Sequence, residues 1–343
     1  MANTVKPLSR HLERLVQKRI QAGESFQLPE AVSLFHRLLS PQNHPPSIFT
    51  INRLLFSISK TKHSSRYSTV VDLFNRLKRT RDRGVFPTIH TFSLVMDCCR
   101  RMGRADLAFS VLGQSLREGC GVDTIMFGSL IKGLCVLKQI PLAAKVFAKM
   151  PLMGCTPNVI IYSTLIEGLC STGDTRLGLE LCRRMAREGG SCKPNVITYN
   201  TLIHGFCKEG EIGMAVEMFK EMTAEEVRPD VITCNILIDG LCKNGDVVTA
   251  RKVFEEMPSC RLAPDLHTYS SLIHGLCSQG DTNSALRMFD EMVAKGVAHI
   301  VSTYNGLILG FCGLGDINKA FEIYDKLVDF GLQANEFTSH IIP

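Results

Sequence analysis

A cysteine recurs at a nearly constant interval through most of this 343-residue chain. Each of these cysteines follows Gly-Leu or Gly-Phe, and they are Cys135, Cys170, Cys207, Cys242, Cys277 and Cys312. Their successive separations are 35, 37, 35, 35 and 35 residues. A fixed period of about 20 to 50 residues is typical of proteins built from stacked repeats. The chain is therefore expected to form one quasi-linear array, in which each repeat contacts its neighbours, instead of two or so globular domains.

The 14 cysteines are interpreted mainly as free, buried thiols. Disulfide scaffolds are small secreted chains, whereas this sequence is 45% hydrophobic and has no signal peptide with a long apolar core. Zinc ligands usually come in close pairs such as C-x2-C, and no such pair is present. A reduced cysteine packs as a small hydrophobic residue. No apolar run reaches the roughly 18 to 20 residues of a membrane span.

One period, residues 196–230, shows how a single repeat is expected to fold. Its first half is VITYNTLIHGFCKEG, in which apolar residues from Leu202 to Cys207 recur at helical spacing and Gly210 permits a left-handed helix end. Its second half has an apolar stripe from Ile212 to Met222 and breaks at Pro229. Each repeat is therefore predicted to be two short antiparallel helices. Neither helix buries its apolar stripe alone, so the repeats must stack.

The same template divides the rest of the chain. The eight complete repeats are 48–88, 89–123, 124–158, 159–195, 196–230, 231–265, 266–300 and 301–335. Residues 1–47 are expected to form a basic N-terminal segment and a helical cap, and 336–343 to begin a further repeat. The glycines predicted between the two helices are Gly103, Gly173, Gly210, Gly245, Gly280 and Gly315. The alanines predicted where two helices approach closely are Ala108, Ala143, Ala215, Ala250, Ala285 and Ala320.

The phrases VITYNTLIHGFCKEG…MAVEMFKEM…RPD at 196–230, VITCNILIDGLCKNG…TARKVFEEM…APD at 231–265 and VSTYNGLILGFCGLG…KAFEIYDKL…QAN at 301–335 resemble the pentatricopeptide repeat. The resemblance covers roughly residues 48–343, and it is similar to the plain 35-residue P class and to plant fertility-restorer-like members. The tetratricopeptide repeat has a 34-residue period and favours a Trp, and this chain has no Trp. The resemblance implies an all-α fold, a right-handed α-solenoid superhelix of stacked helix-turn-helix repeats.

The resemblance also implies a function, the recognition of single-stranded RNA with one base per repeat. The fifth and the last residue of each repeat select the base by hydrogen bonding, and the second residue packs against base faces. The selecting pairs are Asn52 with Thr88, Ser93 with Asp123, Gly128 with Asn158, Ser163 with Asn195, Asn200 with Asp230, Asn235 with Asp265, Ser270 with Ile300 and Asn305 with Asn335. The base-packing residues are Ile125, Ile160, Ile197 and Ile232, with Phe49, His90, His267 and Ser302 as less usual occupants.

The pairs differ in the base that each is expected to select. The resemblance assigns uracil to Asn200–Asp230 and Asn235–Asp265, and adenine to Ser163–Asn195. It assigns guanine, weakly, to Ser93–Asp123, and a cytosine-preferring pyrimidine to Asn305–Asn335. The other three pairs are unusual, because Gly128 has no side chain and Ile300 is apolar. With RNA parallel to the protein chain, the expected sequence is 5′-N-(G)-N-A-U-U-N-(C/U)-3′.

The alternative interpretation of each Asn or Ser at the start of a helix is an ordinary cap residue. The repetition of one polar position between apolar ones, in eight registers, favours base recognition over that alternative. His90 and His267 are interpreted as surface or stacking residues, since no carboxylate or Cys partner recurs beside them.

Charge is unevenly distributed along the chain. Residues 1–104 contain 18 Lys+Arg and 6 Asp+Glu, whereas residues 105–343 contain 21 and 27. The stretch NRLKRTRDRG at 75–84 has five basic residues and one acidic residue. Phosphate neutralisation supplies the sequence-independent part of nucleic-acid affinity, so this end is expected either to anchor the RNA backbone or to be a solvated helix face.

The first twenty residues predict a basic amphipathic helix. Lys6, Arg10, Arg14, Lys18 and Arg19 oppose only Glu13, and Leu8, Leu12, Val16 and Ile20 recur every four residues. Organelle-import presequences are basic and poor in acidic residues, and the alternative is the first helix of the cap. With the resemblance, this segment favours the mitochondrion, with the chloroplast as the alternative.

Sequence motifs of catalysis are missing from the chain. It contains no G-x-x-x-x-G-K-[ST], H-E-x-x-H or G-x-S-x-G. We therefore expect no enzyme activity, cofactor, metal or small-molecule substrate. The expected function is organellar RNA processing, stability or translation, with single-stranded RNA and an organellar RNA-processing protein as partners. The alternatives are a protein-interaction helical scaffold and a truncated paralogue without an RNA target.

Overall fold

All regular structure in the computed structural model is helical over the residues it describes, which are 5–22, 26–41, 44–80, 82, 84–189, 192–298 and 300–333. The α-helices are α1 (Val5–Gln21), α2 (Leu28–Leu38), α3 (Ile48–Lys60), α4 (Arg66–Arg79), α5 (Ile89–Arg101), α6 (Ala105–Arg117), α7 (Thr124–Val136), α8 (Ile140–Lys149), α9 (Val159–Thr172), α10 (Thr175–Glu188), α11 (Val196–Lys208), α12 (Ile212–Ala224), α13 (Val231–Lys243), α14 (Val247–Glu256), α15 (Leu266–Ser278), α16 (Thr282–Ala294), α17 (Val301–Gly313) and α18 (Ile317–Asp329). Two short 3-10 helices follow α8 and α14, namely η2 (Pro151–Met153) and η4 (Pro258–Cys260). The predicted all-α solenoid of stacked helix pairs is confirmed.

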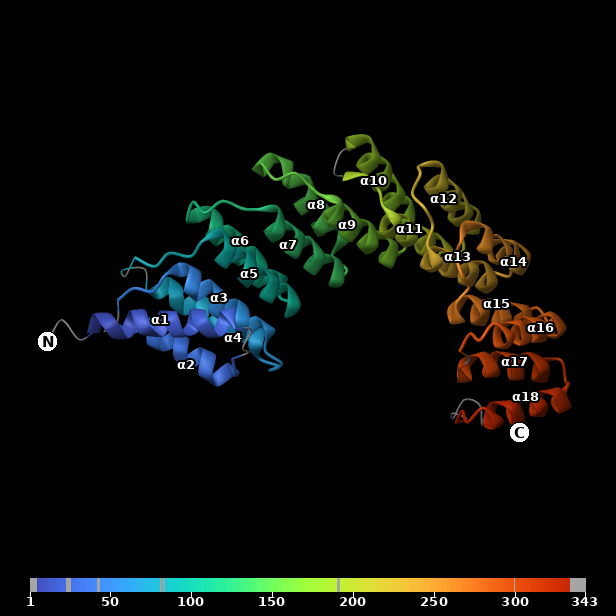
Figure 1. The fold of residues 1–343 in the computed structure, drawn as a ribbon. Helices are drawn as coiled ribbons and strands as arrows, with labels where there is room; N and C mark the ends of the chain where they lie inside the picture. Colours follow the sequence, from blue (N-terminus) through green and yellow to red (C-terminus); the bar gives the residue numbers. More distant parts are fainter. Residues whose placement is uncertain are drawn as a thin grey trace. The chain divides into compact units, whose positions relative to one another are not determined.

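From α3 onward the helices alternate between two roles. We call α3, α5, α7, α9, α11, α13, α15 and α17 the first helices, and α4, α6, α8, α10, α12, α14, α16 and α18 the second helices. Within a unit, a first helix packs against its own second helix and against the next first helix, as α5 does with α6 and α7, and α15 with α16 and α17. Figure 1 shows this hairpin arrangement clearly for α15 to α18.

The chain divides into two compact units. The first comprises Met1–Leu169 with Gly190–Cys192, and the second comprises Cys170–Gly189 with Lys193–Pro343. The first unit therefore contains α1 to α8 and the start of α9, and the second contains α10 to α18. In each unit the helices follow one another in chain order (Figure 1). The segment 336–343 and Asn335 lie outside the described residues.

The N-terminal cap is a pair of helices. Helix α1 packs against α2 and α3, with Leu12 and Val16 buried in the contact. Polar contacts add to this packing, because the backbone N–H of Ser47 donates to Glu13 Oε1 at 2.5 Å and Gln17 Nε2 donates to Thr50 Oγ1 at 3.1 Å. The basic amphipathic segment thus forms a helix that packs against α2 and against the first helix of the first repeat.

The repeated cysteine and glycine pack against each other across neighbouring first helices. A Cβ placed on Gly240 would lie 2.2 Å from Cys207 Sγ, and one on Gly275 would lie 2.5 Å from Cys242 Sγ. Gly168 stands in the same relation to Cys135, at 2.7 Å. The six predicted alanines are also buried. Small residues therefore permit the close approach of the helices, which explains why Gly-x-Cys recurs with the period of the repeat.

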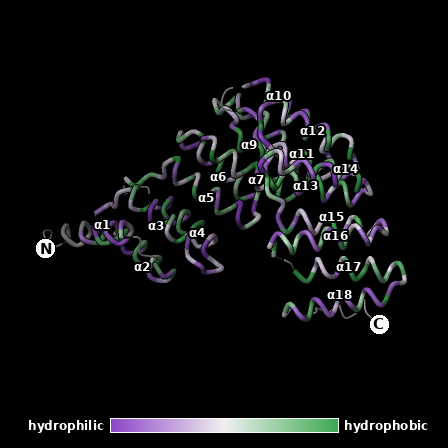
Figure 2. Tube along the Cα trace, turned by 45° about the vertical axis from the view of Figure 1, so that its right-hand side comes forward, coloured by the Kyte–Doolittle hydropathy of each residue, from purple (hydrophilic) through white to green (hydrophobic). Residues whose placement is uncertain are grey.

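Each helix exposes one face and buries the other. In Figure 2, hydrophobic and hydrophilic segments alternate along α15 to α18. The largest buried side chains include tyrosines of first helices, and Tyr269 meets Phe254 edge-on with ring centroids 5.2 Å apart. Thus the core runs between layers of helix pairs, as the apolar stripes of the sequence predict.

The predicted turn glycines all adopt the left-handed conformation, with φ between 68° and 88°. In the 124–158 repeat the corresponding residue is Lys138, which adopts φ 57°. A side chain at such φ costs roughly 1 kcal/mol, so this turn departs from the repeat at some expense in stability.

The cysteines are free thiols, as the sequence predicts. All 14 cysteines are free, and of the six repeated ones only Cys312 is more than marginally exposed. Burial raises the pKa of Cys242 and of Cys277 to about 12. Over the described part of the chain, no helix combines the length and apolarity that a membrane crossing requires.

Candidate nucleic-acid interface

The second residue of most repeats is a large apolar side chain that projects into solvent. The exposed fraction is 64% for Ile125, 72% for Ile160 and 62% for Ile232, whereas most of the other isoleucines of these helices are almost fully buried. Ile197 and Phe49 are similarly exposed. The less usual occupants His90, His267 and Ser302 are also exposed. An exposed apolar side chain at the second position, present in five of the eight repeats, suits contact with flat apolar surfaces such as base faces.

Three of the predicted selecting pairs are joined directly by hydrogen bonds. Asn235 Nδ2 donates to Asp265 Oδ1 at 3.0 Å. Asn52 Nδ2 donates to Thr88 Oγ1 at 3.3 Å. Ser93 Oγ donates to Asp123 Oδ2 at 3.1 Å. The fifth residue of one repeat and its last residue, 30 or 36 positions later, therefore lie side by side.

The last residue of a repeat is also the N-cap of the next first helix. The side chains of Asp123, Asn195, Asp230 and Asp265 each accept a hydrogen bond from a backbone N–H in the first turn of the helix that follows. Helix capping and base selection are therefore compatible at this position, because a cap uses only part of the hydrogen-bonding capacity of a carboxylate.

The structure adds a residue that the sequence analysis missed, a threonine at the third position. Thr91, Thr198, Thr233, Thr268 and Thr303 are buried in the first turn of their helices. Thr268 Oγ1 donates to Asn235 Oδ1 at 2.6 Å, and Thr91 Oγ1 donates to Asn52 Oδ1 at 2.7 Å. The recurrence of Thr before the Tyr or Cys of each phrase was the sequence signal for this contact.

Beside Gly128 the first helices leave an open cavity of about 280 Å³. Its lining includes the predicted residues Ile125, Gly128, Asn158 and Ile160, together with Lys132. A Cβ on Gly128 would meet only Ile161, at 3.5 Å, so the absent side chain leaves free space. The structure thus gathers the predicted residues of two consecutive repeats around one hollow.

The remaining pairs are arranged differently. Asn200 Oδ1 is buried without a hydrogen-bond partner, and Asp230 Oδ1 instead accepts from Thr233 Oγ1 at 2.9 Å. Ser270 Oγ lies 2.9 Å from Thr303 Oγ1, and Ile300 supplies no polar group. Ser163 is half-buried in the first unit, whereas Asn195 caps α11 in the second. Asn305 is buried.

Comparison with known proteins decides the family. The model described as "PPR repeat family" matches residues 122–171, 194–243 and 229–278. The model described as "PPR repeat" matches residues 90–120, 267–297 and 302–332. The model described as "Pentatricopeptide repeat domain" matches residues 158–209. The chain belongs to the pentatricopeptide repeat family.

Relatives of this pentatricopeptide repeat chain include plant proteins with mitochondrial names. It is 35% identical over 110 residues to protein Rf1, mitochondrial, of Oryza sativa subsp. indica, a match to 32% of this chain and 13% of Rf1. It is 30% identical over 120 residues to a putative mitochondrial pentatricopeptide repeat-containing protein of Arabidopsis thaliana, a match to 34% of this chain and 19% of that protein. These matches span less than a fifth of either relative.

A solved structure shares the fold. The pentatricopeptide repeat protein PPR10, in complex with an 18-nucleotide psaJ RNA element, matches with a TM-score of 0.50 and 21% identity, over 96% of this chain and 55% of PPR10.

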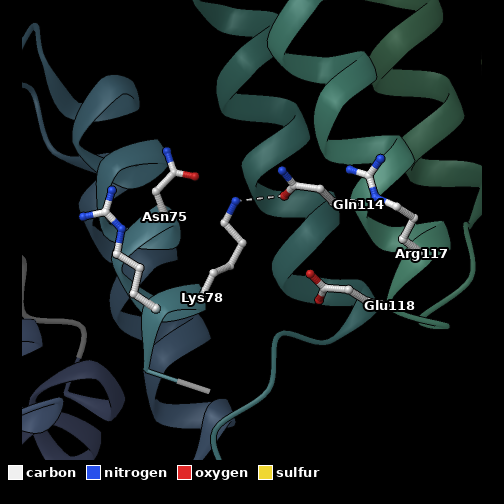
Figure 3. A pocket seen from close by; sticks show the side chains of 6 residues that line it. Asn75, Lys78, Gln114, Arg117 and Glu118 are labelled. Carbon is white, nitrogen blue, oxygen red and sulfur yellow. Dashed lines mark hydrogen bonds between the residues drawn. The ribbon is translucent and has the colours of Figure 1, made fainter. Parts of the chain in front are cut away.

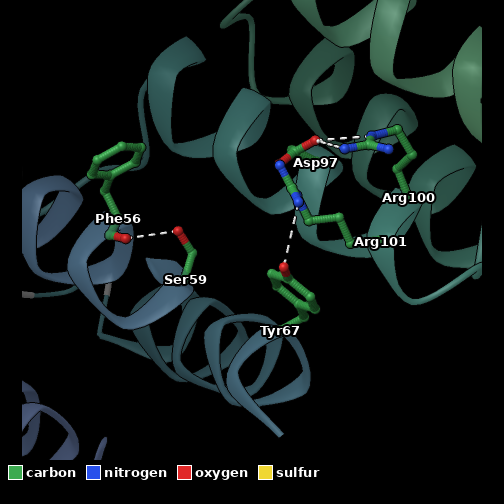
Figure 4. Close-up of polar contacts among 6 residues, drawn as sticks. All are labelled: Phe56, Ser59, Tyr67, Asp97, Arg100 and Arg101. Atoms are coloured by element: carbon green, nitrogen blue, oxygen red, sulfur yellow. Dashed lines mark hydrogen bonds and ion pairs between the residues drawn. The ribbon is translucent and has the colours of Figure 1, made fainter. Parts of the chain in front are cut away.

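Near the Gly128 cavity, charged side chains of the pentatricopeptide repeats neutralise one another. Asp97 accepts from Arg100 Nη2 and from Arg101 Nε, each at 2.7 Å, and Arg101 also reaches the Tyr67 hydroxyl on α4 (Figure 4). Burial alone would raise the pKa of Asp97, but the hydrogen bonds and charges of the two arginines outweigh burial and lower it. Lys132 is therefore the cation of this cavity that is not paired with Asp97.

Residues 75–79 of the basic stretch lie on the second helix α4, and Arg81 and Arg83 lie outside the described residues. Asn75 and Lys78 of α4 face Gln114 and Arg117 of α6 across an open hollow of about 570 Å³ (Figure 3), and Arg79 also lines this hollow. Lys78 Nζ donates to Gln114 Oε1 at 3.0 Å. This surface is separate from the first-helix residues predicted to select bases.

The site offers hydrogen bonding and stacking as its chemistry. Within the part of the chain that the structure describes, His, Cys, Asp and Glu side chains form no group of three that could hold a metal ion. Burial would raise the pKa of Asp265, but bonds from the Thr268 backbone, from Asn235 and from the Thr268 hydroxyl lower it. Asp265 is consequently an anionic acceptor at neutral pH.

Proposed function

We propose that this pentatricopeptide repeat chain binds single-stranded RNA, with one base per repeat, along its first helices. The observation that supports the proposal is the hydrogen-bonded pair of fifth and last residues in repeats 48–88 and 231–265, which also expose an apolar second residue. Such a pair presents polar groups to a base edge while the apolar neighbours contact its faces. PPR10, which shares the fold, is described in complex with RNA.

The biological role that we propose is organellar RNA processing, stability or translation, in the mitochondrion and in the manner of a fertility restorer. The support is the similarity to Rf1 and to an Arabidopsis relative, both named as mitochondrial. The chain would act by occupying a transcript site, and thereby block a nuclease, expose a ribosome site or recruit a processing enzyme. No catalytic step by the chain itself is part of the proposal.

Selection of bound sequences from a random RNA pool tests this function. Enrichment of A-U-U at the positions of the 159–195, 196–230 and 231–265 repeats is the expected outcome. Absence of enrichment, with equal affinity for duplex DNA, would contradict sequence-specific RNA binding. Recovery of protein and no RNA would favour the peptide-binding scaffold instead.

Exchanging the fifth residues tests the register. In the variant Asn200→Thr/Asn235→Thr, the preference at the two corresponding bases is expected to move from uracil toward guanine. The matched control is Asn75→Thr, which makes the same exchange on a second helix and should leave all base preferences unchanged. Unaltered uracil preference in the double variant would show that the register is wrong.

A further inference from the structure

The buried threonine at the third position accompanies the asparagines at the fifth position. Each of Asn52, Asn200 and Asn235 is followed, at the start of the next first helix, by such a threonine. The two repeats that lack the threonine have Met126 or Ile161 instead, and the preceding fifth residues there are Ser93 and Gly128. The same threonine also follows the serines Ser163 and Ser270, so the hydrogen bonds of Thr91 and Thr268, and not the sequence alone, indicate a role in orienting an amide.

The hydrogen bonds around Thr268 have a defined direction. Thr268 Oγ1 accepts from the backbone N–H of Asp265 at 3.0 Å, so its single proton is available to another acceptor. Its shortest contact is with Asn235 Oδ1 at 2.6 Å, compared with 3.0 Å to Asp265 Oδ1. Asn235 Nδ2 in turn donates to Asp265 Oδ1. The side-chain amide of Asn235 is thereby fixed at both ends.

A fixed amide presents one kind of group to a ligand. Its oxygen is occupied by the Thr268 hydroxyl, so one N–H of Nδ2 remains to be donated. Among the described residues, Asp265 Oδ2 has no hydrogen-bond partner and remains an acceptor. A donor beside an acceptor complements the edge of uracil, where O4 accepts and N3–H donates. The same edge of cytosine has the reverse polarity, because its N4 donates and its N3 accepts.

We propose that Thr268 is a positioning residue, which sets the preference of the Asn235–Asp265 pair for uracil over cytosine by fixing the orientation of the Asn235 amide. This inference rests on the proposed RNA-binding function. Thr91 orients the amide of Asn52 in the same way, because its hydroxyl donates to Asn52 Oδ1 at 2.7 Å. In the Asn200 register the proton of Thr233 goes to Asp230 instead, so the inference applies to Asn52 and Asn235 alone.

Binding to four RNA octamers, 5′-AGAAUXAC-3′ with X as U, C, A or G, tests the proposal in the full chain. Thr268→Val removes the hydroxyl and keeps the shape of the side chain, and Thr268→Ser keeps the hydroxyl. Thr50→Val is the matched control, because Thr50 is equally buried at the same position and no selecting pair precedes it. The net value of one hydrogen bond corresponds to about a tenfold change in an equilibrium constant.

The expected result is that the U:C affinity ratio falls about tenfold in Thr268→Val and is retained in Thr268→Ser and Thr50→Val. A wild-type preference for U that persists in Thr268→Val would overturn the role of the threonine and leave RNA binding intact. Equal binding of all four octamers by the wild type would contradict the proposed function.

A second measurement tests the positioning without RNA. Hydrogen exchange of the Asn235 side-chain amide, followed by NMR in the free protein, should be about tenfold faster in Thr268→Val than in the wild type or in Thr268→Ser. Equal exchange in all three proteins would overturn the inference whether or not RNA binds, since the hydroxyl would then not hold the amide.

Discussion

The glycine two residues before each repeated cysteine is in contact with the cysteine of the preceding repeat. Gly240 lies against Cys207, and a side chain on Gly240 would overlap the sulfur at 2.2 Å. In an α-helix glycine normally costs about 1 kcal/mol relative to alanine. The close approach of neighbouring first helices therefore outweighs helix propensity at this position.

Gly240→Ala is predicted to destabilise the fold by about 2 kcal/mol, because overpacking typically costs 1–3 kcal/mol and exceeds the gain in helix propensity. Gly213→Ala is the control, since Gly213 lies in α12 with nothing within 4 Å of the added carbon. Urea-unfolding midpoints measure both. A midpoint for Gly240→Ala equal to or above that of Gly213→Ala would refute the packing argument.

The buried thiols predict a loss of stability at alkaline pH. Burial raises the pKa of Cys242 to about 12, whereas a cysteine in the unfolded chain ionises near its ordinary value, about 8.5. The stabilisation is complete below that ordinary pKa, and it is lost as pH rises because the unfolded state alone releases the proton. Above pH 9, each such thiol lowers the free energy of unfolding by up to about 1.4 kcal/mol for each further pH unit.

Urea unfolding at pH 7.5, 8.5 and 9.5 with a reductant measures this dependence. The midpoint should fall with pH in the wild type and in Cys260→Ala, because Cys260 is exposed. The fall should be shallower in Cys242→Ala, which removes one titrating group. Parallel pH profiles for Cys242→Ala and Cys260→Ala would show that burial does not set the ionisation of Cys242.

At the scale of helices, the sequence was sufficient to predict that each element is a helix and which of its faces is buried. The first helices begin at Ile48, Ile89, Thr124, Val159, Val196, Val231, Leu266 and Val301, which are the first residues of the eight predicted repeats. Periodic apolar residues, turn glycines and caps act within a single repeat. The pattern of one repeat therefore predicts the helices of the other repeats. The two interpretations of residues 1–20 could not be separated, because packing of Leu12 and Val16 depends on α3.

The hydrogen bonding of the candidate site was not predictable in the same way. The repeats 196–230 and 231–265 share VIT-x-N and a final Asp, yet Asn235 bonds to its Asp and Asn200 does not. The threonine proton goes to Asp230 in one repeat and to Asn235 in the next, and this choice depends on how neighbouring repeats pack. Sequence periodicity therefore locates the site residues, and it does not determine which donor or acceptor each presents.

At the scale of the molecule, the separation of charge from the predicted base contacts bears on affinity. The first 104 residues have a formal charge of +12 and the remainder −6. Arg100 and Arg101 are paired with Asp97, and Lys78, Arg79 and Arg117 surround a hollow between second helices. Lys78, Arg79 and Arg117 thus lie away from the residues proposed to contact bases, whereas Arg100 lines the Gly128 cavity and is paired there with Asp97.

Neutralising the hollow between α4 and α6 is predicted to leave RNA recognition almost unchanged. For single-stranded nucleic acid, the slope of log affinity against log salt changes by about 0.7 for each phosphate contact. The variant Lys78→Gln/Arg79→Gln/Arg117→Gln should change this slope by less than about 0.7 for the octamer with X as U, because RNA along the first helices does not reach these side chains. The control is Arg183→Gln/Arg184→Gln/Arg187→Gln, which removes the same charge from the exposed face of α10. A slope reduced by about 2 in the first variant alone would mean that three phosphates lie in the hollow, and that RNA crosses from the first helices to the second.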